Sequence, residues 1–188
     1  MHEEAGTIAA QMGRPLAGTS RVAVRCHLGL PLAIETAPED DAGAPFPTLW
    51  YLTCPLARRR LSRLEHAGWV RALTARLEQD PAFAAAFARA NEAYTRARAA
   101  RVPAGSPVAA RLHPGVGGTA GAVKCLHAHW AHGVAGGPNP VADAIRDRVE
   151  PLDCDVPCVL DGSWNPAWRE PRRPSSSDQG GPSAPPGL

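Results

Sequence analysis

One segment gathers more chemically reactive side chains than any other: VKCLHAHWAH, residues 123–132, holds one thiol and three imidazoles. If it forms a helix turning about 100° per residue, Cys125, His129 and His132 point to one face and His127 lies nearly opposite. A thiolate and an imidazole four residues apart can share a metal ion, because zinc accepts both sulfur and nitrogen ligands. We therefore expect zinc at Cys125 with either His129 or His132.

Two further cysteines are expected to reach the same ion. Cys26 ends the first predicted strand and Cys54 ends the third, so neighbouring antiparallel strands can bring both thiols to one end of the sheet. With the helix packed there, Cys26, Cys54, Cys125 and one histidine form a Cys3His site. Four protein ligands would make the ion structural, with partner binding as the task of the domain. Three ligands would leave a position for an activated water and make hydrolysis the reaction.

Three alternatives to zinc stay open at this stage. The cysteines can be small buried hydrophobic residues, which is common for this residue type. One of them can be a reactive thiol in a redox protein, or three of them can hold an iron–sulfur cluster together with a histidine or Cys158. Cys154 and Cys158, in CDVPC, can join the cluster, bind an ion as a pair, or flank it from a loop.

Basic residues near the same end of the sheet predict an anion or cofactor site. Arg21, Arg25 and Lys124 can flank it, and the free backbone N–H groups at the start of a 122–134 helix add to the positive field. Ordinary solvated charges are the alternative. The basic run within residues 58–63 is interpreted as a solvated helix face, because no aromatic platform for bases is interleaved with it.

The elements that must position these residues follow from hydrophobic spacing and from the Gly and Pro positions. Alternating residues predict strands around 22–24, 32–34 and 46–53. Apolar residues at helical spacing predict helices at 5–13, from 55 to a break at Gly68, from 69 through 77, at 81–102, at 122–134 and at 140–149. We expect a single α+β domain over residues 1–161, with a small antiparallel sheet of about three strands covered by about five helices. Residues 162–188, rich in Pro, Gly and Ser, are expected to be a disordered tail.

Composition narrows the class of protein. The 188 residues, 19.8 kDa, fit one domain plus a tail. The formal net charge of +2 lacks the basic excess of non-specific nucleic-acid binding, so we do not expect nucleic acid as a partner. No stretch reaches the ~20 apolar residues that span a bilayer, and the start MHEE lacks the positive charge of a signal peptide. We expect a cytoplasmic protein with reduced cysteines and no membrane partner, in which helices over residues 55–101 can bind a protein partner.

Short motifs occur in a fixed order along the chain. They are RC and GLP within 25–31, ETAP at 35–38, PFPTLWYLTCP at 45–55, LSRLEHAGW at 61–69, VKCLH at 123–127, AH at 131–132 and NPVAD at 139–143. In these motifs, over about residues 5–150, the sequence resembles a family from high-GC bacteria known only as domain of unknown function 501. The family carries no established activity.

The resemblance implies which positions belong to family motifs. They are Arg25, Cys26, Thr36, Pro38, Phe46, Pro47, Thr48, Cys54, Lys124, Cys125, His127, His132 and Asp143. His127 thereby joins Arg25 and Lys124 as a candidate cofactor-binding residue. The family motif favours His127 or His132 as the fourth metal ligand, whereas helical spacing favours His129.

Overall fold

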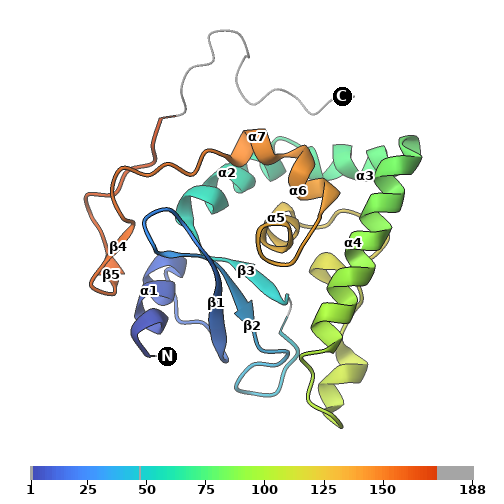
Figure 1. Ribbon diagram of the computed structural model, residues 1–188, viewed down its shortest axis with the longest axis horizontal. Coiled ribbons are helices and arrows are strands. Elements are labelled where there is room, and N and C mark those ends of the chain that lie inside the picture. Colours follow the sequence, from blue (N-terminus) through green and yellow to red (C-terminus); the bar gives the residue numbers. More distant parts are fainter. Residues whose placement is uncertain (1, 47, 173–188) are drawn as a thin grey trace.

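The computed structural model describes residues 2–46 and 48–172, in which helices surround a small sheet (Figure 1). The helices are α1 (His2–Met12), α2 (Pro55–His66), α3 (Trp69–Gln79), α4 (Pro81–Ala99), α5 (Leu126–Ala135), α6 (Pro140–Ala144) and α7 (Arg146–Val149), with short 3-10 helices at Pro107–Arg111 and Val116–Gly118. The strands are β1 (Ser20–Arg25), β2 (Pro31–Thr36), β3 (Trp50–Leu52), β4 (Val159–Leu160) and β5 (Ser163–Trp164). The predicted single α+β domain is confirmed. No helix in the described ranges is long and apolar enough to cross a bilayer.

The expected three-stranded antiparallel sheet is present, with β2 in the centre. Ile34 of β2 lies opposite Val22 on one side and Tyr51 on the other. Ala33 and Ile34 are fully buried, because both faces of the sheet are covered. Ile8 of α1 packs against Ile34 on one face, and α5 packs against the sheet from the other (Figure 1).

Local signals set the boundaries of the helices between residues 55 and 99. Gly68 separates α2 from α3 with a φ of 89°, a left-handed conformation that glycine adopts without strain. Asp80 caps α4, because its carboxylate accepts a hydrogen bond from the Phe83 N–H at 3.0 Å. The apolar stripe of α4 then faces the core, where Phe83, Phe87 and Tyr94 are all buried.

α5 begins at Leu126, four residues later than the predicted 122–134 helix. Cys125 is the residue before the helix, with an extended backbone (φ −148°, ψ 118°). The helix predicted over 140–149 is likewise interrupted at Ile145, between α6 and α7. The side chain of Cys125 therefore does not follow helical spacing, which the prediction of its metal partners assumed.

The described chain packs beyond residue 161, where the composition predicts the start of a disordered tail. β4 and β5 pair antiparallel and contact α1. Trp168 is 3% exposed; its ring lies edge-on to Trp164 at 5.3 Å between centroids and under the Arg59 guanidinium at 4.9 Å. Two tryptophans thus give this proline-rich segment an apolar surface to bury. The remainder of the predicted tail, residues 173–188, lies outside the described residues.

Asn139 ties α5 to α6 with its whole side-chain amide. Its Oδ1 accepts hydrogen bonds from the N–H groups of Val141 and Ala142, at 3.1 and 3.2 Å, and so caps α6. Its Nδ2 donates to Nδ1 of His129 at 3.1 Å and to Nδ1 of His132 at 3.0 Å. Burial lowers the pKa of both imidazoles to about 4, so both are neutral and can accept these bonds at pH 7.

Replacing Asn139 separates the two functions of this side chain. Asn139→Ala is expected to cost about 3 kcal/mol in the free energy of unfolding, from about 1 kcal/mol for the helix cap and about 1 kcal/mol for each lost bond. Asn139→Ser restores the cap but not the bonds, so it should cost about 2 kcal/mol. Urea denaturation measures both values, and losses below ~0.5 kcal/mol in both variants would contradict the tie between the helices.

A matched pair of tryptophans tests the packing of the segment after residue 161. Trp168→Ala should cost about 3 kcal/mol, because the side chain is buried. Trp164→Ala should cost well under that amount, because Trp164 is 40% exposed. Equal losses in denaturant titrations of the two variants would mean that Trp168 is not buried as described.

Candidate metal centre

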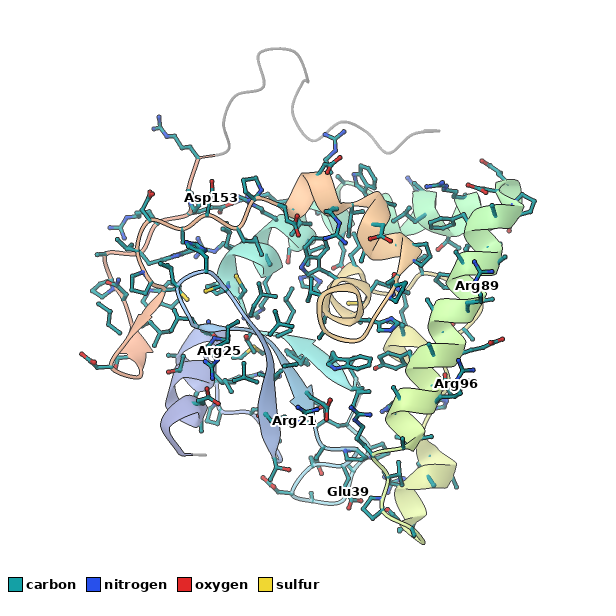
Figure 2. The ribbon with its side chains drawn as sticks, in the orientation of Figure 1. Arg21, Arg25, Glu39, Arg89, Arg96 and Asp153 are labelled. Carbon is teal, nitrogen blue, oxygen red and sulfur yellow. The ribbon has the colours of Figure 1, made fainter. Side chains whose placement is uncertain are left out.

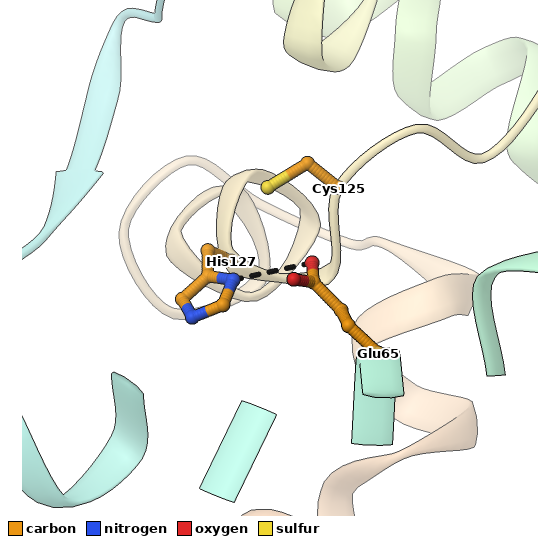
Figure 3. Close-up of side chains that lie close together, drawn as sticks. All are labelled: Glu65, Cys125 and His127. Atoms are coloured by element: carbon orange, nitrogen blue, oxygen red, sulfur yellow. Dashed lines mark hydrogen bonds and ion pairs between the residues drawn. The ribbon is translucent and has the colours of Figure 1, made fainter. Parts of the chain in front are cut away.

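Glu65, Cys125 and His127 come together from two helices (Figure 3). One ligand atom of each residue lies within 4.8 Å of those of the other two, and all three residues are half-buried. Glu65 lies in the last turn of α2, Cys125 immediately precedes α5, and His127 is the second residue of α5. Within residues 2–46 and 48–172, no other group of three or more His, Cys, Asp or Glu residues meets this distance.

Glu65 is oriented by the start of α5. Its Oε1 accepts a hydrogen bond from the backbone N–H of Leu126 at 2.7 Å and lies 3.2 Å from Nδ1 of His127. Burial alone would raise the pKa of the carboxyl group. Interactions with His127, the Leu126 N–H and the Cys125 side chain outweigh burial and hold that pKa below its ordinary value. The side chain is therefore an anion at neutral pH.

The two ring nitrogens of His127 have different surroundings. Nε2 lies 3.1 Å from the carbonyl oxygen of Arg58 and 3.3 Å from Oγ of Ser62. A carbonyl oxygen only accepts, so Nε2 carries its hydrogen and Nδ1 is directed at the carboxylate of Glu65. Burial would lower the pKa of His127, but Cys125 and Glu65 raise it to about 10. The position between these side chains thus favours a positive charge, whether a proton on Nδ1 or a metal ion.

Cys125 and His127 also line a cavity of about 890 Å³. One side of the cavity is the surface of α2 that carries Ser62 and three arginines, Arg58, Arg59 and Arg63. Aromatic rings of Trp50, Tyr51 and Trp164 line it as well. Of the described residues that line the cavity, none is Asp or Glu. The cavity therefore suits a ligand that combines a negative charge with an apolar part.

The predicted Cys3His set is not brought together. Cys26 and Cys54 line a second, small cavity with Cys154 and Cys158, whereas Cys125 lines the large one. This separation has a physical reason. α5 starts after Cys125, so the side chain of Cys125 points toward α2 and not along the face of the helix that packs on the sheet.

His129 and His132, the favoured fourth ligands, belong to the core. Both are buried and accept hydrogen bonds from Asn139. His132 stacks on the Trp50 ring, with 5.2 Å between centroids and 10° between planes, and His129 packs against Phe87. In place of these two residues, the structure brings His127 to Cys125.

The basic residues proposed as a cofactor site lie apart from the cluster. Arg25 pairs with Glu4 and donates to the carbonyl oxygen of Gly29 at 2.9 Å. Lys124 is exposed, and Arg21 pairs with Glu35 at 2.8 Å. The large cavity is lined by none of these three basic residues. Of the predicted cofactor-binding residues, only His127 takes part in the site.

Sequence reasoning missed Glu65 and the arginines of α2. Arg58 and Ser62, like Arg59 and Arg63, are four residues apart and so share a helix face. The basic run was interpreted as a solvated face because no aromatic residues are interleaved with it. The aromatic residues that line the cavity with it come from distant segments of the chain. Arg63 is additionally held by Glu170, through hydrogen bonds of 2.5 and 2.7 Å, and the charge of Arg59 also acts on Glu170. Arg58 donates to the carbonyl oxygen of Gln11 at 3.2 Å.

Comparison with known proteins gives a family and no relative of known activity. No curated protein and no solved structure matches the chain. The family model described as protein of unknown function DUF501 matches residues 22–147. This range is more than half of the chain and contains Glu65, Cys125 and His127, whereas Cys154 and Cys158 lie beyond it. The resemblance seen in the motifs is confirmed, and the chain belongs to the DUF501 family.

Proposed function

We propose that this protein binds one zinc ion through Glu65, Cys125 and His127 and uses it for metal-assisted hydrolysis of an anionic substrate. The observation that carries the proposal is the convergence of three ligand atoms, two of whose residues, Cys125 and His127, line a cavity of about 890 Å³. Three protein ligands leave a coordination position for water, which is the pattern of catalytic zinc sites.

The donor set fits zinc. Thiolate, imidazole and carboxylate are the ligand types that this ion takes in proteins. The 3.2 Å between Nδ1 of His127 and Oε1 of Glu65 is close to the ~3.3 Å separating two tetrahedral ligands with bonds of about 2.0 Å. Hydrogen bonds to the ligand side chains favour the same geometry. The carbonyl oxygen of Arg58 accepts from Nε2 of His127, and the Leu126 N–H donates to Oε1 of Glu65.

A cysteine nucleophile is the competing function for the same three residues, and the hydrogen bonds of His127 disfavour it. In a nucleophile–base–acid relay, one ring nitrogen faces the thiol and the other faces the carboxylate. Here Nδ1 faces Glu65, and Nε2 is bonded to Arg58 O and Ser62 Oγ. The Cys125 side chain also hydrogen-bonds to the His127 ring, and because Nε2 is bonded to Arg58 O, the thiol and the carboxylate both face Nδ1. The relay needs them on opposite nitrogens, whereas a metal ion requires only that the three ligand atoms converge.

The chain's own residues supply the rest of the site. A bound zinc ion polarises substrate and lowers the pKa of a water molecule. Arg58 and Arg59 line the cavity and can orient a phosphate or carboxylate group of the substrate. Trp50, Tyr51 and Trp164 provide apolar surface for the remainder of the substrate and restrict water on that side.

Zinc content tests the ligand set. Cys125→Ser is expected to lower the zinc content by one equivalent per chain, because a neutral hydroxyl group replaces the thiolate. Metal analysis of protein purified without an affinity tag measures this loss. In cobalt-substituted protein, the absorption from sulfur-to-cobalt charge transfer contributed by this site should disappear as well. The control His66→Asn removes an exposed histidine beside Glu65 and should retain all metal. Unchanged zinc in Cys125→Ser would reject the site.

An aryl phosphate, 4-nitrophenyl phosphate, tests the reaction class and the anion specificity together. Zinc-loaded protein should hydrolyse it, and Arg58→Gln should lower kcat/KM about tenfold, the effect of losing one charge-assisted hydrogen bond. Zinc content should stay unchanged in that variant. Arg71→Gln, on the exposed side of α3, is the matched control. Hydrolysis that survives removal of zinc, or no hydrolysis by zinc-loaded protein, would contradict the proposal.

A further inference from the structure

Four of the five cysteines surround a second, much smaller cavity. Cys26, Cys54, Cys154 and Cys158 line a space of about 20 Å³. They come from the turn after β1, the residue that precedes α2, and the irregular segment between α7 and β4. Figure 2 shows sulfur atoms, in yellow, gathered below the β1–β2 turn and close to α1. Segments more than 100 residues apart in sequence thus contribute thiols to one point.

The thiols interact with one another. Burial raises the pKa of Cys54 to about 12, and the neighbouring Cys154 and Cys158 raise it further. Burial also raises the pKa of Cys158, as do Cys26 and Cys154. These directions agree with the geometry, in which all four free thiols line one small cavity.

N–H groups are directed at the sulfur atoms. Gln11 Nε2 donates to Sγ of Cys158 at 3.5 Å, an interaction between buried side chains. The backbone N–H groups of Ala57 and Leu56, in the first turn of α2, act on Cys54 in the direction that favours its thiolate. Such donors are the outer shell that supports thiolates bound to a metal, because a neutral thiol is only a weak acceptor.

We propose that Cys26, Cys54, Cys154 and Cys158 form a tetrathiolate site for a structural zinc ion. The site is separate from the Glu65–Cys125–His127 centre and does not depend on the function proposed for it. A cavity of this size holds about one water molecule, and an ion enclosed by four thiolates needs no more room. On binding, the four thiols release their protons to solvent and four zinc–sulfur bonds form, with no change in oxidation state.

Binding an ion between these four thiols requires them to move closer together. No three of the four sulfur atoms lie within 4.8 Å of one another, as far as the described residues show. Cys154 and Cys158 are in a segment without helix or strand, so they can move toward Cys54 at the rigid start of α2. The positive charge of Arg60 acts on Cys154 and partly offsets the negative charge of four thiolates.

The site would fasten the segment after residue 150 to the part of the chain that the family model covers. Cys26 and Cys54 lie within residues 22–147, and Cys154 and Cys158 lie beyond. Zinc at this point joins α2 and the turn after β1 to the segment that leads into β4 and β5. Because a structural zinc ion stabilises the folded state only, its removal should lower the thermal midpoint.

Zinc analysis of two matched variants tests the proposal. Cys154→Ser combined with Cys158→Ser should lose one zinc equivalent per chain and unfold at a lower temperature. Cys125→Ser should keep this zinc and lose only the equivalent bound at the other centre. The full zinc content of wild-type protein in the double variant would overturn the proposal, and so would iron in place of zinc in wild-type protein.

Alkylation of wild-type protein avoids any folding defect of the variants. Iodoacetamide followed by peptide mapping should find Cys26, Cys54, Cys154 and Cys158 protected in the zinc-loaded protein. A chelator should make all four reactive together. Equal alkylation of these four thiols with and without zinc, or disulfide bonds among them in freshly purified protein, would overturn the tetrathiolate site even if zinc remains at Cys125.

Discussion

The hydrogen bond from the Leu126 N–H to Oε1 of Glu65, 2.7 Å long, joins the end of α2 to the start of α5. The first N–H groups of a helix have no partner within the helix, and a carboxylate there satisfies one of them while interacting favourably with the helix dipole. With α5 anchored in this way, Cys125 is held in extended chain just before the helix and His127 faces α2. The next turns then direct His129 and His132 into the core.

The three histidines within residues 127–132 therefore differ in the direction of their pKa shifts. The carboxylate of Glu65 and the thiol of Cys125 make a positive charge favourable at His127, and its pKa rises to about 10. His129 and His132 meet an amide donor and aromatic rings, and burial lowers their pKa to about 4. Only His127 can exchange a proton for a metal ion at neutral pH without breaking the core. Proximity in sequence says little about this difference, because it depends on which element each ring contacts.

The local signals of the sequence were sufficient for most of the fold. The Gly68 break depends on one residue and was predicted, as were a helix starting at residue 81 and the order of three strands before the long helices. The cluster was not predictable in the same way. A helix that starts at 126 instead of 122 changes the direction of Cys125, and Glu65 meets it across 60 residues of sequence. The packing of residues 162–172 was not predictable from composition, because the Pro and Gly content conceals the burial of Trp168.

Charge distinguishes the tasks of the two proposed zinc sites. A zinc ion held by one carboxylate, one thiolate and a neutral imidazole is formally neutral, so Arg58 and Arg59 keep the large cavity positive and attractive to an anion. Four thiolates leave a zinc ion with a formal charge of about −2, which repels anions. The guanidinium of Arg60, held by the carbonyl oxygen of Val149 at 2.7 Å, lies beside the segment that carries Cys154 and offsets part of that charge. Zinc would thus serve substrate binding and hydrolysis at the open, neutral Glu65–Cys125–His127 centre. At the closed, negatively charged tetrathiolate site it would stabilise the fold.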